Sequence, residues 1–197
     1  TVSAATTVDD VFLAFAFDVS GSMGEEDYPW HDPTLKWEPV TAACRAFLED
    51  DASAGFHASM TFFPADSDKC EDSSYSEPNV PFTALPATVF GDAFDAILED
   101  DWRGGTPTRH VLQGVLDFVI STRDENPGRY AIVLVTDGYP QGCDDNDIDS
   151  VVSIAEDGAA AGVLTYVIGV ANPPLEGAPE TVEDLGAIAT GGGTENA

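Results

Sequence analysis

Three short, uninterrupted apolar runs constrain the fold of this chain most. They cover residues 11–19, 130–136 and 164–170, and each ends close to a glycine or a proline. Their length and their content of Phe, Val, Ile and Leu favour strands that are buried on both faces over helices. A membrane-spanning helix needs about 20 apolar residues, far more than any of these runs contains. The sequence therefore predicts central strands of a sheet and no direct membrane insertion by this segment.

Helical patterns separate the predicted strands. The segments with apolar residues at helical spacing are 40–48, 90–98, 111–120, 148–160 and 181–189. Two further strands are predicted at 56–63 and 80–85, and Pro81 assigns the second to a sheet edge because proline has no amide hydrogen to donate. Strands that alternate with helices of this length predict a doubly wound α/β fold. We expect a mostly parallel sheet with one antiparallel edge strand and helices on both faces.

Size and charge limit the number of domains and the kinds of partner. The 197 residues make one domain, 1–197, and 36 acidic residues outnumber 7 basic ones, for a formal net charge of -29. Nucleic acids bind proteins through clustered Lys and Arg, which this chain lacks. We therefore expect no nucleic-acid partner, and an anionic membrane surface is disfavoured for the same reason.

Oxygen-bearing side chains gather where three predicted segments meet the same rim of the sheet. Asp18, Ser20 and Ser22 alternate at the end of the first strand, Asp137 follows the strand at 130–136, and Thr106 lies in a glycine-rich loop. Ligands of doubly wound folds bind at the carboxyl ends of the strands. Carboxylates and hydroxyls, without histidine or thiolate, suit a hard divalent cation. The sequence thus predicts a site for one Mg²⁺, Ca²⁺ or Mn²⁺ ion.

The Asp-x-Ser-x-Ser segment, with the threonine loop and the later Asp-Gly, resembles the von Willebrand factor A family and its metal-ion-dependent adhesion site. The resemblance implies that Asp18, Ser20, Ser22, Thr106 and Asp137 hold the metal, and all five positions match the motif. It also implies that the serines and the threonine ligate directly while the carboxylates act directly or through water. Without a metal, Asp18 and Ser20 would simply cap a turn and Asp137 would sit in an Asp-Gly loop.

The resemblance extends from about residue 11 to residue 193 and carries further implications. Short segments at 78–86, 104–108 and 136–140 resemble those of bacterial secreted or surface members of the family. The family normally adds a final strand and helix beyond the point reached by Ala197, so we expect either that this domain belongs to a longer protein or that its sheet is completed differently. An extracellular or cell-surface location follows, with a lipid anchor in segments outside this sequence as one option.

The three cysteines leave one thiol unpaired within the chain. Cys70 precedes the edge strand and Cys143 lies six positions beyond Asp137, so we expect both at the loop rim, where they can form a disulfide. Such a bond agrees with an oxidising location. Cys44 shares its helical stripe with other apolar residues and is expected in the core.

Two acidic segments near the predicted metal site have more than one interpretation. Glu25, Tyr28 and Trp30, together with Tyr139, are expected to form a partner-binding face, although an ordinary exposed insertion explains the loop at 23–37 equally well. The carboxylates at 145, 147 and 149 alternate as in a calcium-binding loop, but Ser150 stands where such a loop needs glycine. We interpret them as the acidic start of a helix.

These features together predict a binding module that is not an enzyme. It engages a protein partner whose Asp or Glu carboxylate enters the open coordination position of the metal. Three alternatives remain at this level. One is an accessory subunit of an ATP-driven chelatase-type machine, and another is a metal-stabilised structural module. The third is a metal-dependent hydrolase, for which no general base is identifiable in the sequence.

Overall fold

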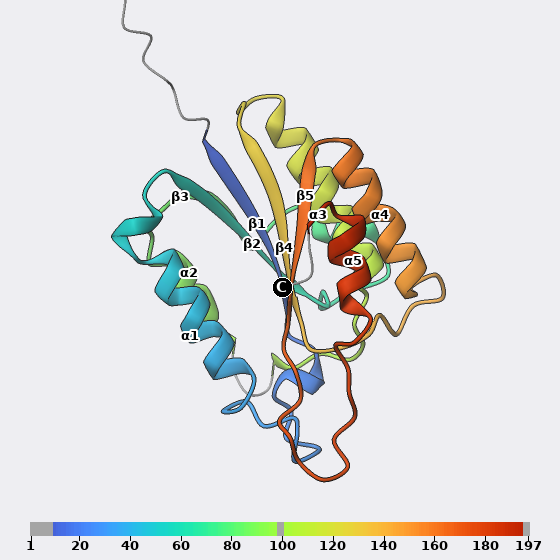
Figure 1. The fold of residues 1–197 in the computed structure, drawn as a ribbon. Helices are drawn as coiled ribbons and strands as arrows, with labels where there is room; N and C mark the ends of the chain where they lie inside the picture. Colours follow the sequence, from blue (N-terminus) through green and yellow to red (C-terminus); the bar gives the residue numbers. More distant parts are fainter. Residues whose placement is uncertain (1–9, 98–100, 195–197) are drawn as a thin grey trace, which may run out of the picture.

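A five-stranded sheet forms the centre of the molecule. The computed structural model describes residues 10–97 and 101–194, and the strand order is β3-β2-β1-β4-β5 (Figure 1). The strands are β1 (Val11–Asp18), β2 (Phe56–Phe63), β3 (Val80–Ala84), β4 (Arg129–Thr136) and β5 (Val163–Gly169). All neighbours pair in parallel except β2 and β3, which are antiparallel. This arrangement confirms the predicted fold class, including the antiparallel edge strand that contains Pro81.

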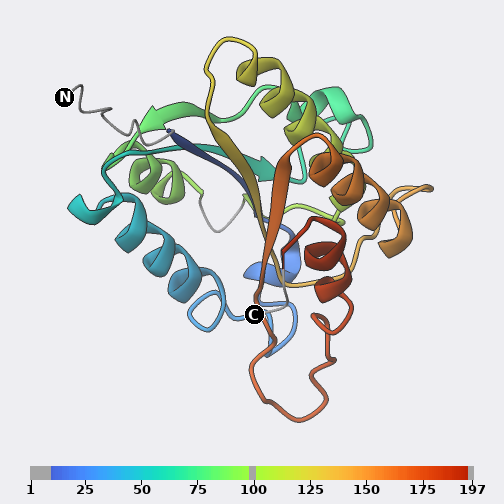
Figure 2. The same ribbon diagram turned by 45° about the horizontal axis from the view of Figure 1, so that its top comes forward.

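Helices cover both faces of the sheet. They are α1 (Trp37–Leu48), α2 (Val89–Asp95), α3 (Thr108–Arg123), α4 (Ile148–Ala160) and α5 (Leu185–Gly191). Figures 1 and 2 show α1 and α2 on one face and α3, α4 and α5 on the other. Side-chain alternation in β4 produces the two layers, because Ile132 and Leu134 pack in the core under α3 and α4 while Val133 and Val135 pack in the core under α1 and α2. The structure therefore has two apolar cores, one on each side of the sheet.

The helices begin and end for identifiable reasons. Asp147 caps α4, since its carboxylate accepts a hydrogen bond from the Ser150 amide at 2.8 Å and the Ser150 hydroxyl accepts one from the Asp147 amide at 3.1 Å. The acidic segment before α4 is thus the start of a helix, as predicted. The helix expected at 181–189 begins four residues later, at Leu185, and the helix expected at 90–98 ends at Asp95. Leu98 lies outside the described residues.

One strand prediction needs correction. The run at 164–170 is not buried on both faces, because β5 is an edge strand and Leu164, Tyr166 and Ile168 are 38%, 47% and 40% exposed. The strand register aligns these residues with Ala131, Val133 and Val135, and so with the face that carries α1 and α2. These two helices lie toward the β3 side of the sheet and do not reach β5 (Figure 1).

Short 3₁₀ turns complete the described fold, at Gly21–Met23 (η1), Asp51–Ser53 (η2) and Asp72–Tyr75 (η3). Among the described residues, no helix has the length and the apolar content that crossing a membrane requires. The feature that matters most for the site is η1. It begins after two residues that follow β1, and it brings Ser22 to Asp137 at the carboxyl end of β4.

Candidate metal centre

Two buried carboxylates lie side by side at the carboxyl ends of β1 and β4. The parallel register of these strands pairs Phe17 with Val135, so Asp18 and Asp137 follow at the same rim. Their side chains are almost completely buried, at 0% and 1% exposure. Asp18 is fixed by two hydrogen bonds, since its Oδ1 accepts from the Ser20 amide at 2.7 Å and its Oδ2 accepts from the Thr136 hydroxyl at 2.6 Å. The sheet itself therefore positions both acids.

The two serines connect these carboxylates. After β1 the chain enters η1, which places the Ser20 and Ser22 hydroxyl oxygens 3.0 Å apart. The Ser22 hydroxyl then donates to Oδ1 of Asp137 at 2.8 Å. Four of the five predicted ligand residues thus form one continuous hydrogen-bonded group. Its members come from two segments separated by more than one hundred residues.

The fifth predicted ligand, Thr106, lies in a loop that is paired with both of these segments. Arg103 exchanges backbone hydrogen bonds with the β1 end of the site, accepting from Gly21 at 2.9 Å and donating to Val19 at 3.0 Å. Thr106 itself forms a reciprocal pair of 2.9 Å backbone hydrogen bonds with Gln141, four residues beyond Asp137. The loop is therefore held between the segments that carry the other ligands.

The hydroxyl oxygen of Thr106, Oγ1, is the most informative single atom of the site. The residue is 1% exposed, and within the described part of the chain its Oγ1 has no hydrogen-bond partner. A buried hydroxyl without a partner is costly, by about 1 to 3 kcal/mol. Its carbonyl is meanwhile fixed by the Asn146 side-chain amide at 2.8 Å. The loop is thus rigidly held with one oxygen unsatisfied, which is what a metal-ligating hydroxyl requires.

The electrostatics of the site favour an added cation. Burial raises the pKa of Asp18 to about 7, and repulsion from the Asp137 carboxylate adds to the effect. One cation is already present, because the Lys36 ammonium donates to Oδ2 of Asp137 at 2.6 Å and to the Ser22 carbonyl at 2.9 Å. None of the ion pairs among residues 10–97 and 101–194 involves Asp18. With both carboxylates ionised and a single ammonium beside them, the site carries a net charge of -1 and lacks one positive charge.

These observations fit a hard divalent cation. The donor set consists only of carboxylate and hydroxyl oxygens, as Mg²⁺, Ca²⁺ and Mn²⁺ prefer. The unsatisfied hydroxyl of Thr106 and the uncompensated charge at Asp18 are both features that a bound cation would satisfy. Sequence reasoning predicted the five oxygen-bearing residues as ligands but did not identify Lys36, Thr136 or Asn146 as their neighbours. The only sequence signal for Lys36 was an isolated lysine at the end of an acidic loop.

The residues predicted to bind a partner occupy the same rim with different exposure. The Glu25 amide donates to the Gly21 carbonyl at 2.8 Å, so this acid lies directly beside η1. Tyr28 is 52% exposed and stacks on Trp30, with ring centroids 5.2 Å apart. Trp30 in turn lies against Gly177 of the segment between β5 and α5. Tyr139 is half-buried, two residues beyond Asp137.

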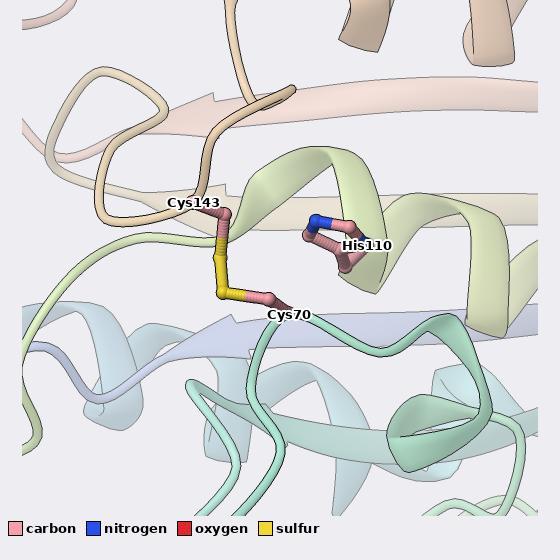
Figure 3. A group of neighbouring side chains, drawn as sticks. All are labelled: Cys70, His110 and Cys143. Carbon is pink, nitrogen blue, oxygen red and sulfur yellow. A yellow bond between two sulfur atoms is a disulfide. The ribbon is translucent and has the colours of Figure 1, made fainter.

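A disulfide ties together two loops of this rim. The predicted bond between Cys70 and Cys143 is present, with the Cα atoms 5.8 Å apart. Figure 3 shows the imidazole of His110, from α3, directed toward this bond. Oδ1 of Asp72 lies 2.7 Å from the Nδ1 atom of His110. Because the two sulfur atoms bond to each other, they offer no thiolate to a metal, and Cys44 is buried in the core as expected.

Comparison with known proteins identifies similar structures but no similar sequences. No protein-family model and no curated protein matches the sequence. The pilus adhesin SpaC from Lactobacillus rhamnosus GG superimposes with a TM-score of 0.64 at 15% identity, over 93% of this chain and 28% of the adhesin chain. The chain therefore spans little more than a quarter of that protein.

Two further structures resemble this fold. The VWA domain of SpRpn10 matches with a TM-score of 0.59 at 13% identity, over 96% of this chain and 84% of that domain chain. Proximal thread matrix protein 1 from the mussel byssus, in a structure with a zinc-occupied MIDAS motif, matches with a TM-score of 0.55 at 16% identity. That match covers 82% of this chain and 36% of the byssus protein. At these identities the comparisons establish the fold and nothing finer.

Proposed function

We propose that this chain, which has the von Willebrand factor A fold, is a protein-binding module whose activity depends on a divalent cation. Asp18, Ser20, Ser22, Thr106 and Asp137 hold the cation at the carboxyl ends of β1 and β4. The observation that carries the proposal is the buried Thr106 hydroxyl, which lacks a partner among the described residues beside a hydrogen-bonded group of serines and carboxylates.

The residues of the chain have separate tasks in this proposal. Thr136 and the Ser20 amide orient the Asp18 carboxylate, and Asn146 orients the Thr106 loop. When bound, the cation supplies positive charge and one exchangeable coordination position. That position takes an Asp or Glu carboxylate of the partner. Ser22 is only half-buried, so its side of the site is the one that faces an incoming group.

The charge of the domain restricts the partner surface. A net charge of -29 repels acidic surfaces over the Debye length, which is about 10 Å at 0.1 M salt. A neutral or basic surface that presents one carboxylate is therefore the preferred partner. Glu25, Tyr28, Trp30 and Tyr139 form the adjoining contact face. The stacked pair of Tyr28 and Trp30 offers rigid aromatic area of the kind that protein interfaces favour.

We place the module at the cell surface or outside the cell, as part of an adhesin or a similar assembly. The disulfide supports an oxidising location, and pilus proteins are among the structures with the same fold. An accessory subunit of a cytosolic ATP-driven machine, which would keep its thiols reduced, is disfavoured by the same bond. The module acts by binding and carries out no catalysis.

A metal-stabilised structural module is the competing function, and the burial of three proposed ligands favours it. Asp18, Thr106 and Asp137 are each at most 1% exposed, so a cation held only by these three would be sealed from any partner. The two functions differ in whether a water on the bound cation can be exchanged. They also differ in whether loss of Thr106 harms ligand binding more than stability.

The test uses Mn²⁺ as the probe metal. Calorimetry should show one Mn²⁺ ion per chain, with affinity reduced at least tenfold in Thr106→Ala, since one of five ligands is lost. Thr83→Ala, which removes an exposed hydroxyl on β3, serves as the control and should bind normally. Bound Mn²⁺ should also enhance water proton relaxation, and added acetate should lower that enhancement by displacing a water. Tight binding without exchangeable water would favour the structural module, and absence of Mn²⁺ binding would exclude both functions.

A further inference from the structure

We infer that Lys36 is an internal counter-cation of the metal centre, which stabilises the metal-free site and weakens its affinity for a divalent cation. The inference rests on the proposed metal site and concerns its regulation. Lys36 would therefore raise the concentration of divalent cation that is needed to fill the site, because the cation must compete with the ammonium group for Asp137.

The contacts of Lys36 are specific. The residue ends the long loop after η1 and immediately precedes α1, yet its side chain reaches across to the carboxyl end of β4. Its ammonium group donates to Oδ2 of Asp137 at 2.6 Å and to the Ser22 carbonyl at 2.9 Å. The other oxygen of the same carboxylate, Oδ1, accepts from the Ser22 hydroxyl. Asp137 is therefore shared between a proposed metal ligand and a lysine.

The burial of Lys36 sets it apart from the other basic residues. Its side chain is 1% exposed, and among the described residues no other lysine or arginine is buried. Removing an ammonium group from water is strongly unfavourable unless it is paired and hydrogen-bonded. The chain has only 7 basic residues against 36 acidic ones, and one of these few lies beside the buried carboxylates of Asp18 and Asp137.

Two effects of opposite sign follow from this position. Without metal, the ammonium group compensates the Asp137 carboxylate beside Asp18 and so stabilises the fold. With metal, the ammonium group and the cation draw on the same carboxylate and repel each other in a site with little water to screen them. A lysine that only packed against its neighbours would stabilise both states equally and leave metal affinity unchanged.

The test is Lys36→Met, measured by Mn²⁺ calorimetry and by thermal unfolding in EDTA and in saturating Mn²⁺. We expect the Mn²⁺ dissociation constant to fall at least tenfold while the melting temperature in EDTA falls. Saturating Mn²⁺ should raise the melting temperature of the variant by more than it raises that of the wild type, because the metal replaces the missing charge.

The control is Arg123→Met, which also removes one positive charge but from the end of α3, away from the carboxyl ends of the strands. Arg123 is half-buried and donates to the Ala161 carbonyl, and within the described part of the chain it contacts neither the Thr106 loop nor the two carboxylates. Its charge is distant from the site, so the Mn²⁺ affinity of this variant should stay within about twofold of the wild-type value. A comparable gain of affinity in both variants would mean that net charge, and not the position of Lys36, governs the site.

The outcomes separate this inference from the proposed function. Wild-type protein that binds no Mn²⁺ overturns the proposed function itself. Wild-type binding combined with unchanged or weaker binding by Lys36→Met overturns only the role of Lys36. If Lys36→Met does not fold in EDTA, Lys36→Gln is measured in the same way, since its amide can still donate to Asp137 without carrying charge. Failure of both variants to fold in saturating Mn²⁺ also overturns the inference, because the metal should then supply the lost charge.

Discussion

At the scale of single residues, Asp18 makes stability depend on pH. Burial, and then repulsion from Asp137, raises the pKa of Asp18 from 3.8 to about 7 in the folded protein. Between these two values the folded state binds more protons than the unfolded state. The contribution of Asp18 is therefore most favourable below pH 4 and declines as pH rises toward 7, above which it stays constant.

The first prediction is that the metal-free protein loses this contribution between about pH 4 and pH 7. Many other carboxylates ionise over the same range, so the quantity to measure is the difference in unfolding free energy between wild type and Asp18→Asn in EDTA. As pH rises, the wild type should lose unfolding free energy relative to Asp18→Asn, because the asparagine amide does not ionise. A difference that is independent of pH would contradict the raised pKa.

Cys44 gives a second prediction at this scale. The thiol is 8% exposed on the inner face of α1, and burial raises its pKa to about 11. Reactivity toward thiol reagents requires the thiolate, so Cys44 should not react with a disulfide reagent at pH 8 in the native protein. One thiol per chain should react after unfolding in guanidinium, and none in Cys44→Ala. Rapid labelling of the native wild type would show that α1 opens readily.

The residues of the site differ in how far the sequence predicts them. Asp18, Ser20 and Ser22 form a contiguous pattern at a strand end, and alternation along an extended segment is sufficient to predict that they share a side. Lys36, Thr136 and Asn146 could not be found in this way. Their roles depend on the path of loops and on the register of two strands, and no local spacing specifies either. The metal ligation itself stays a prediction.

At the scale of elements, the disulfide holds the loop after β2 against the loop after β4. Cys70 and Cys143 are separated by 73 residues, so the bond restricts a long segment of the unfolded chain. We predict that Cys70→Ala/Cys143→Ala lowers the unfolding free energy by about 3 to 4 kcal/mol, measured by denaturant titration. Cys44→Val, which removes the free thiol and keeps an apolar side chain, is the control and should cost less than about 1.5 kcal/mol. Equal stability of wild type and double variant would contradict the prediction.

The elements were predicted well where burial alone defines them. The runs that became β1 and β4 are buried on both faces, and apolar composition is sufficient to identify such strands. The prediction for β5 was wrong about its exposed face because composition does not reveal which helices lie opposite a strand. The start of α5 was misplaced for a similar reason. Its apolar residues Val182 and Leu185 both pack in the core, although the helix includes only the second.

At the scale of the whole molecule, the net charge of -29 acts on stability and not only on partner choice. Like charges spread over a compact surface repel each other, and they separate when the chain unfolds, so low salt destabilises the folded state. In EDTA, raising NaCl from about 10 mM to about 0.5 M shortens the screening length from about 30 Å to less than 8 Å. We predict that this change increases stability by at least about 1 kcal/mol, which raises the melting temperature by about 2 to 4 °C.

General screening and specific cation binding can be separated in the same measurement. Under the proposed function, Mg²⁺ at matched ionic strength should stabilise the wild type more than NaCl does, because it would bind at Asp18 and Asp137 in addition to screening the surface. In Asp137→Ala the additional stabilisation by Mg²⁺ should disappear while the response to NaCl remains, since one substitution hardly alters the overall charge. Identical responses to the two salts in the wild type would indicate screening alone. A melting temperature that falls with NaCl would show that attractive surface ion pairs outweigh the repulsion.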